Sequence, residues 1–80
     1  MTRVLLFGPL RDLAGWRERA FDAAPTLAAL KAAMASQDPA LGVALDGPGV
    51  QAAVDKVLVR GDVGLRANAE VAFLPPMSGG

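Results

Sequence analysis

Two adjacent glycines, Gly79 and Gly80, end the sequence and follow closely on a pair of prolines. Glycine has no side chain to pack, and it loses more backbone entropy on ordering than other residues. The α-carboxylate of Gly80 is ionised at neutral pH. Converted to a mixed anhydride or a thioacid, it becomes an acyl donor or a sulfur source, and glycine leaves its carbonyl sterically open. We therefore expect Gly80 to be the reactive group of the chain.

The residues that precede Gly80 are expected to form an extended tail. The two prolines favour polyproline geometry, and the penultimate glycine lets the backbone pass through a slot that a Cβ would block. Six extended residues, 75–80, reach about 20 Å, enough to enter a buried active site in another protein. The alternative interpretation is that residues 75–80 are a frayed end without a function. The tail-insertion residues are expected to be Pro75, Pro76, Met77, Ser78 and Gly79.

Other side chains offer little chemistry. The chain has no cysteine and no histidine, so no thiol chemistry and no metal site are expected. Its acidic residues are scattered, and no two form a convincing acid–base pair. Lys plus Arg and Asp plus Glu both number eight, which argues against a nucleic-acid partner. The apolar stretches are shorter than the ~20 residues that span a bilayer, so no membrane contact is expected and the cytoplasm is the default location.

The first half of the chain predicts two strands and a helix. The apolar run Val4–Phe7 is expected to form a strand that ends at Gly8-Pro9, and residues 17–21 a second strand. Residues 10–13 are compatible with one helical turn. Thr26 is a good N-cap for a helix whose leucines and methionine recur at helical spacing. Asp38-Pro39 is expected to stop that helix.

The second half of the chain predicts a hairpin and a final strand. The segment Pro39–Leu45 is compatible with either a loop or a short helix. Val50–Val54 and Val57–Arg60 flank Asp55-Lys56, which is a weaker hairpin turn than Asn-Gly. Glu70–Leu74 is the last strand. The sequence thus predicts one α+β domain, residues 1–74, in which one main helix packs across a mixed β-sheet whose first and last strands run parallel if adjacent.

Strand alternation predicts an apolar surface beside the tail. If Val71 and Phe73 face the helix, Leu74 faces away, and the same argument turns Phe7 outward on the first strand. With Leu58 from the hairpin, these side chains would form an exposed patch, which usually marks an interface. The alternative is that some of them belong to the core.

Several segments together resemble the small subunit of molybdopterin synthase, a family of ubiquitin-like sulfur carriers. "FLPPMSGG" resembles that family's ending, and "RVLLFGPLRDLAG" its opening. "AAVDKVLV" resembles its hairpin and "NAEVAFLPP" its last strand. Asp55 departs from the family, which often has asparagine there, and residues 35–49 match weakly. The resemblance therefore covers both ends of the chain.

The resemblance implies a β-grasp, ubiquitin-like fold and a mechanism. An adenylating enzyme would use ATP on Gly80, and sulfur transfer would then give a thiocarboxylate. The carrier itself would bind no cofactor, would contribute no catalytic side chain, and would act as the sulfur-donating subunit of a sulfurtransferase. It would form a hetero-oligomer with the large synthase subunit. The positions that match the partner-binding surface of the family are Phe7, Leu58 and Leu74.

Two further interpretations stay open. One is a carrier for thiamine thiazole synthesis or a protein-modifying homologue, although those usually lack the Pro-Pro run. The other is a ubiquitin-like interaction domain whose end is inert. Arg11 could reach an acidic group of a partner, and a solvated arginine is equally compatible with the sequence. Trp16 is expected to act as a packing cap.

Overall fold

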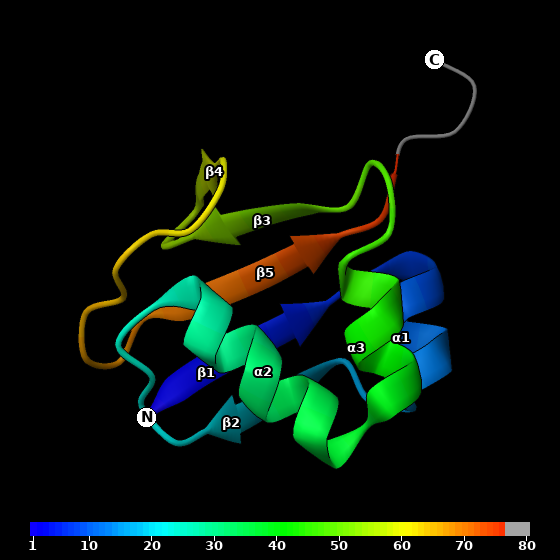
Figure 1. Cartoon of the computed structure of the whole chain (residues 1–80), viewed down its shortest axis with the longest axis horizontal. Coiled ribbons are helices and arrows are strands. Elements are labelled where there is room, and N and C mark those ends of the chain that lie inside the picture. The colour runs from blue at the N-terminus through cyan, green and yellow to red at the C-terminus, as the bar shows by residue number, and fades with distance from the viewer. Residues whose placement is uncertain (77–80) are drawn as a thin grey trace.

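The computed structural model describes residues 1–76 and contains a five-stranded sheet with three helices (Figure 1). The strand order is β2-β1-β5-β3-β4, so the first and last strands are adjacent at the centre of the sheet. The strands are β1 Thr2–Leu6, β2 Glu18–Phe21, β3 Gln51–Val54, β4 Val57–Val59 and β5 Glu70–Leu74. The helices are α1 Gly8–Ala14, α2 Leu27–Gln37 and α3 Pro39–Leu45.

Strand pairing confirms the predicted mixed sheet. β1 and β5 run parallel, with Val4 opposite Val71, and the other three pairs are antiparallel. Parallel neighbours need a crossover connection, and the chain between β2 and β3 supplies α2 for it. This is the β-grasp architecture of the α+β class that the sequence predicts. Within residues 1–76, none of the helices has the length and apolar character needed to cross a membrane.

The core lies between the sheet and the helices that cover one of its faces (Figure 1). Val4 and Leu6 of β1 and Val71 and Phe73 of β5 are at most 1% exposed, which confirms the predicted alternation. From α2, the buried residues are Leu27, Leu30 and Met34, as their helical spacing predicts. The opposite face of the sheet carries no helix and is called the open face below.

Local capping explains where α2 begins and ends. The Thr26 hydroxyl accepts a hydrogen bond from the backbone N–H of Ala29 at 3.1 Å, which confirms the predicted N-cap. Asp38 ends α2 in an extended conformation, as expected before a proline. Its carboxylate then accepts from the N–H of Leu41 at 3.2 Å and so caps α3.

The segment that the sequence left open is helix α3. Leu41 and Leu45 are buried in the core, so packing stabilises this short helix. Gly42 allows a close approach to α2, because a Cβ built on it would lie 2.4 Å from the Cβ of Ala35. The single main helix of the prediction is therefore accompanied by two shorter ones.

Three predicted bounds near the N-terminus are wrong. β1 covers Thr2–Leu6 rather than Val4–Phe7, and Phe7 is instead the N-cap of α1. The expected helical turn at 10–13 is the longer helix α1, because Pro9 suits a first helical turn, where its missing N–H is no loss. The second strand also begins one position later than expected, at Glu18.

The hairpin between β3 and β4 has the predicted turn, with strands trimmed to Gln51–Val54 and Val57–Val59. Asp55 and Lys56 both adopt positive φ angles, 49° and 71°. Two central residues with φ above zero are what a type I′ turn requires, and this turn matches the twist of the flanking strands. Aspartate is among the residues that enter this region most readily.

Candidate functional site

The candidate site begins where β5 ends. Leu74 is the last strand residue, Pro75 is half-buried and Pro76 is exposed. In Figure 1, β5 points toward the end of the molecule that carries α1 and α3. The other expected tail residues, Met77, Ser78, Gly79 and the reactive Gly80, lie outside the described residues, so the division of the chain into 1–74 and 75–80 stays a prediction.

Two glycines lie close against the base of the tail, Pro75 and Pro76. A Cβ on Gly8 would lie 3.2 Å from Cγ of Pro75, and a Cβ on Gly49 would lie 2.7 Å from Cβ of Pro76. Both glycines also have positive φ angles, +54° and +81°, which L side chains rarely adopt. We call these two glycines the tail clasp. Space and backbone geometry both require glycine at these two positions.

A row of apolar side chains crosses the open face. The register aligns Leu58 with Ala53, Ala53 with Ala72, and Ala72 with Leu5. The row ends at Glu18 on β2, which lies opposite Leu5. Since paired residues of neighbouring strands project to the same face, this row forms a continuous apolar strip over four strands. The residues of the strip are Leu5, Ala53, Leu58 and Ala72.

The three predicted partner-binding residues lie on or next to this strip. Leu58 is 59% exposed and Phe7 is 41% exposed, while Leu74 is half-buried. Leu74 follows Ala72 by two positions along β5, so it continues the same face toward the tail. Phe7 follows Leu5 by two positions and keeps an extended backbone. We call the strip together with Phe7 and Leu74 the docking surface.

Arg11 and Trp16 lie in and just after α1. Arg11 is exposed to solvent, and its Nε lies 3.6 Å from a carboxylate oxygen of Asp12, which is exposed as well. Trp16 is half-buried, with its ring centroid 5.9 Å from that of Phe21. The guanidinium of Arg19 stacks over the Trp16 ring at 5.1 Å. Trp16 thus covers one edge of the core.

Charged groups gather at the end of the open face that is opposite the tail. Arg3 pairs with Glu70, the first residue of β5, and the Nε of Arg66 lies 2.9 Å from Asp55. The Asp55 carboxylate also accepts from the backbone N–H of Glu70 at 3.0 Å. That N–H, followed by Arg66, lowers the pKa of Asp55, and the Glu70 carboxylate raises the pKa of Arg3.

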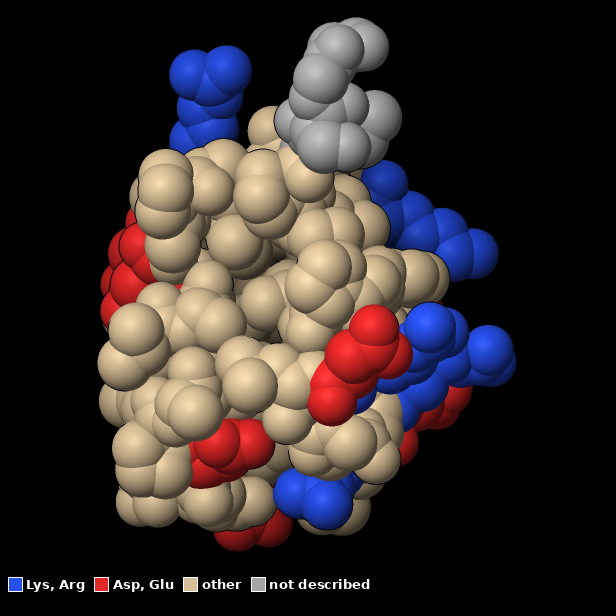
Figure 2. Space-filling model, turned by 90° about the vertical axis from the view of Figure 1, so that its right-hand side faces the viewer, with Lys and Arg blue, Asp and Glu red and all other residues tan. Residues whose placement is uncertain are grey.

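Figure 2 shows the side of the molecule formed by α1 and α3. Uncharged residues cover most of it, and Lys and Arg side chains lie at its margins, most of them along the right-hand edge of the view. Val43 of α3 and Leu13 of α1 are 76% and 50% exposed. The surroundings of the tail base therefore offer apolar contact rather than a strong field of one sign.

Sequence reasoning missed the tail clasp and the partners of Asp55. The sequence predicts only that Gly8 ends the first strand, and the positive φ angles of Gly8 and Gly49 are typical of turns. Their contacts with the two prolines join positions far apart in the chain, and a single sequence carries no signal for such contacts. The proximity of Asp55 to Glu70 arises in the same way, from the pairing of β3 with β5.

The chain is similar to known proteins in both sequence and structure. Residues 4–80 match the ThiS family. The molybdopterin synthase sulfur carrier subunit of Escherichia coli (strain K12) is 42% identical over 82 residues, which cover all of both chains.

The fold also resembles solved structures of small archaeal modifier protein 1. The crystal structure from Haloferax volcanii has a TM-score of 0.85 and 24% identity, and it covers 99% of this chain and 98% of that chain. The solution structure from Methanosarcina acetivorans has a TM-score of 0.86 and 22% identity, with coverage of 99% and 95%. At such identities the likeness shows a shared ubiquitin-like fold. The match over nearly the whole chain, together with the full-length relative, shows that this chain belongs to the ThiS family.

Proposed function

We propose that the chain is the sulfur-carrier subunit of a molybdopterin synthase. The observation that carries this proposal is the 42% identity, over the full length of both chains, to a protein of that name. The ending Pro-Pro-Met-Ser-Gly-Gly agrees with it, because it offers a carboxylate on a narrow, unbranched backbone. The carrier would work in the cytoplasm, in a hetero-oligomer with the large synthase subunit.

The proposed chemistry proceeds in three steps. In an activating enzyme, the Gly80 carboxylate attacks ATP, so that an acyl-adenylate forms and pyrophosphate leaves. A sulfur nucleophile then displaces AMP, which leaves a thiocarboxylate at Gly80. In the large subunit, the thiocarboxylate sulfur would bond to a carbon of the pterin precursor and displace an oxygen substituent there, which gives a thioester. Water would then cleave the acyl–sulfur bond, so that the sulfur stays on the precursor and the Gly80 carboxylate is restored. ATP is thus bound by the activating enzyme. The carrier supplies the C-terminal carboxylate, which is activated and, after the sulfur has been transferred, regenerated.

The docking surface and the tail would share the binding task. Ordering six tail residues costs about 1–2 kcal/mol each in backbone entropy, which tail contacts alone would have to offset. Burying a large apolar side chain contributes about 1.5–3 kcal/mol, so Phe7, Leu58 and Leu74 together can match much of this cost. The tail clasp would limit the directions in which the tail leaves the domain, and so reduce the entropy lost on insertion.

The test is the intact mass of the carrier made together with its activating enzyme. We expect one oxygen at the C-terminus to be exchanged for sulfur, and deletion of Gly80 to abolish both this change and molybdoenzyme activity in cells. An unchanged mass, or activity that survives the deletion, would contradict the carrier proposal. Restored thiazole synthesis without molybdoenzyme activity would assign the carrier to the thiamine pathway instead.

A further inference from the structure

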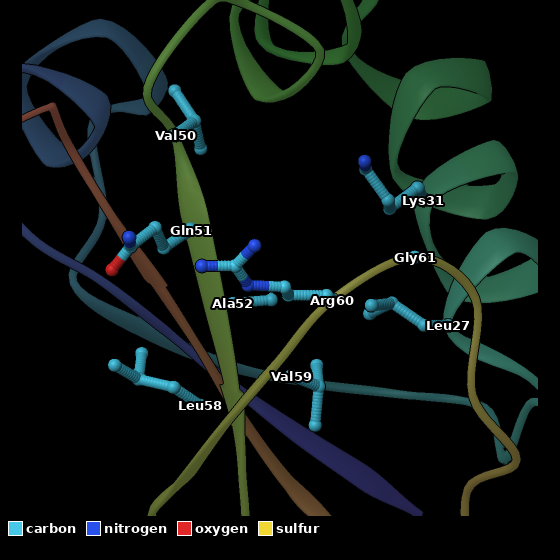
Figure 3. A pocket seen from close by; sticks show the side chains of 9 residues that line it. All are labelled: Leu27, Lys31, Val50, Gln51, Ala52, Leu58, Val59, Arg60 and Gly61. Carbon is cyan, nitrogen blue, oxygen red and sulfur yellow. The ribbon is translucent and has the colours of Figure 1, made fainter.

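A bay of about 500 Å³ lies beside the docking surface, between helix α2 and strands β3 and β4 (Figure 3). Its apolar lining includes Leu27 of α2, Ala52 of β3 and Val59 of β4. Leu27 and Ala52 are buried members of the core. The bay is therefore an apolar hollow on the surface of the core, formed where the short edge strand β4 ends.

Two cationic side chains line this hollow. Figure 3 shows Arg60 extending from the end of β4 across the bay, and Lys31 reaching out from α2. The ammonium of Lys31 lies 2.9 Å from the carboxylate of Asp46 and is already paired. Arg60 forms no ion pair with any residue of the part that the structure describes, 1–76. Because Asp46 neutralises Lys31, the positive charge beside the bay that no carboxylate of residues 1–76 pairs with is that of Arg60.

The guanidinium of Arg60 selects the class of ligand. A guanidinium accepts a carboxylate or a phosphate through two parallel hydrogen bonds. One surplus positive charge is balanced by a monoanion, whereas a phosphate at neutral pH adds more negative charge than Arg60 alone can neutralise. The apolar lining also needs an apolar group beside the anion, since a bare ion would leave this lining in contact with water. An aliphatic carboxylate satisfies both conditions.

The bay and the docking surface meet at the edge of the sheet that β4 forms. Leu58 lines the bay and also forms one end of the apolar strip on the open face. Gln51, another lining residue, lies opposite Leu74 in the sheet. The side chains of Ala52 and Val59 face the helix side of the sheet, so a protein that covers the docking surface reaches Arg60 and the bay by passing around the sheet edge at Leu58.

We propose that the bay receives an acidic side chain, carried on an apolar segment of the large synthase subunit. This inference rests on the proposed function and adds a specificity-determining contact to it. The apolar part of the segment contacts Leu27 and Val59, and its carboxylate pairs with the guanidinium of Arg60. The contact selects a partner by charge, because a neutral or basic residue there would leave Arg60 desolvated without a counter-ion.

The test compares the affinity of the purified large subunit for the wild-type carrier, R60E and K56E, by titration calorimetry. Lys56 is the matched control, since it is an exposed cation of the same hairpin whose side chain lies outside the bay. We expect R60E to weaken binding about tenfold or more, and K56E to change it less than about threefold. Thermal unfolding of each variant verifies that the fold is unchanged.

A second measurement locates the contact. The Nε–H resonance of Arg60 in ¹⁵N-labelled carrier is expected to shift on addition of the large subunit and to stay in place with sodium acetate or inorganic phosphate alone. Equal affinities of R60E and K56E, or an Arg60 resonance that shifts with either small anion and not with the large subunit, would overturn the inference. If the wild-type carrier does not bind the large subunit at all, the proposed function itself fails, which is a distinct result.

Discussion

Gly49 and Pro76 approach each other so closely that any side chain at position 49 would collide with the tail. A Cβ on Gly49 would lie 2.7 Å from Cβ of Pro76 and 3.5 Å from its Cα. The turn before β3 therefore lies directly against Pro76, a residue far from it in the sequence.

We predict that G49A destabilises the domain more than G61A does. Both glycines have positive φ angles, +81° and +68°, so alanine costs roughly 1–2 kcal/mol at either position. Only position 49 adds a clash, since a Cβ on Gly61 meets nothing within 4 Å. Urea unfolding measures the stability of each variant. The rate of sulfur transfer to the pterin precursor reports whether the tail is still positioned to react. Equal stabilities and equal transfer rates of the two variants would contradict the clasp.

The docking surface predicts that L58A lowers affinity for the large subunit and leaves stability nearly unchanged. Leu58 is 59% exposed, so its truncation should alter the free energy of unfolding by no more than about 0.5 kcal/mol. A buried interface leucine is expected to contribute about 1–2 kcal/mol to binding, a loss of roughly five- to thirtyfold. V43A on α3, which is 76% exposed, is the control. Equal affinities of L58A and V43A would place the interface elsewhere.

The buried hydroxyl of Thr2 predicts a stabilising substitution. Thr2 is 1% exposed, and its Oγ1 has no hydrogen-bond partner among the residues described, 1–76. Removing an unsatisfied buried hydroxyl relieves a desolvation cost of about 1–3 kcal/mol, and valine keeps the shape of threonine. We expect T2V to raise the free energy of unfolding by about 1 kcal/mol. T2S, which keeps the hydroxyl and loses a methyl, should be less stable than wild type.

Asp55 predicts a pH-dependent contribution to stability. Hydrogen bonds from the Glu70 N–H and from Arg66 lower the pKa of Asp55 in the folded state. Because the pKa of Asp55 is lower in the folded state, its carboxylate contributes fully to stability at pH values above the unfolded-state pKa of about 3.9. This contribution is lost as the pH falls through the lower pKa of the folded state.

The variant D55N tests this contribution, because asparagine also accepts a left-handed backbone and offers a carbonyl to the N–H of Glu70. We expect D55N to be less stable than wild type at neutral pH and the two to converge in acid, as measured by denaturant unfolding across the pH range. A difference that persists unchanged in strong acid would rule out the charge of Asp55 as its source.

Periodicity and capping made much of the fold predictable. Thr26 and Asp38 mark the two ends of α2, and their roles depend only on neighbours within a few positions. The alternation of Val71 and Phe73 likewise follows from the twofold period of a strand. It was not predictable that α3 forms a helix, because that helix is stabilised by packing of Leu41 and Leu45 into a core made by distant segments.

The sequence by itself determined the order of the five strands and of α2, and the buried faces of the two central strands, because these follow from local patterns of polarity and backbone preference. Only the tertiary structure decided which glycines lie against the prolines of the tail base, and that Arg60 and Lys31 line one bay. Those relationships depend on how the crossover brings separate strands and turns together, and no local pattern encodes such distances.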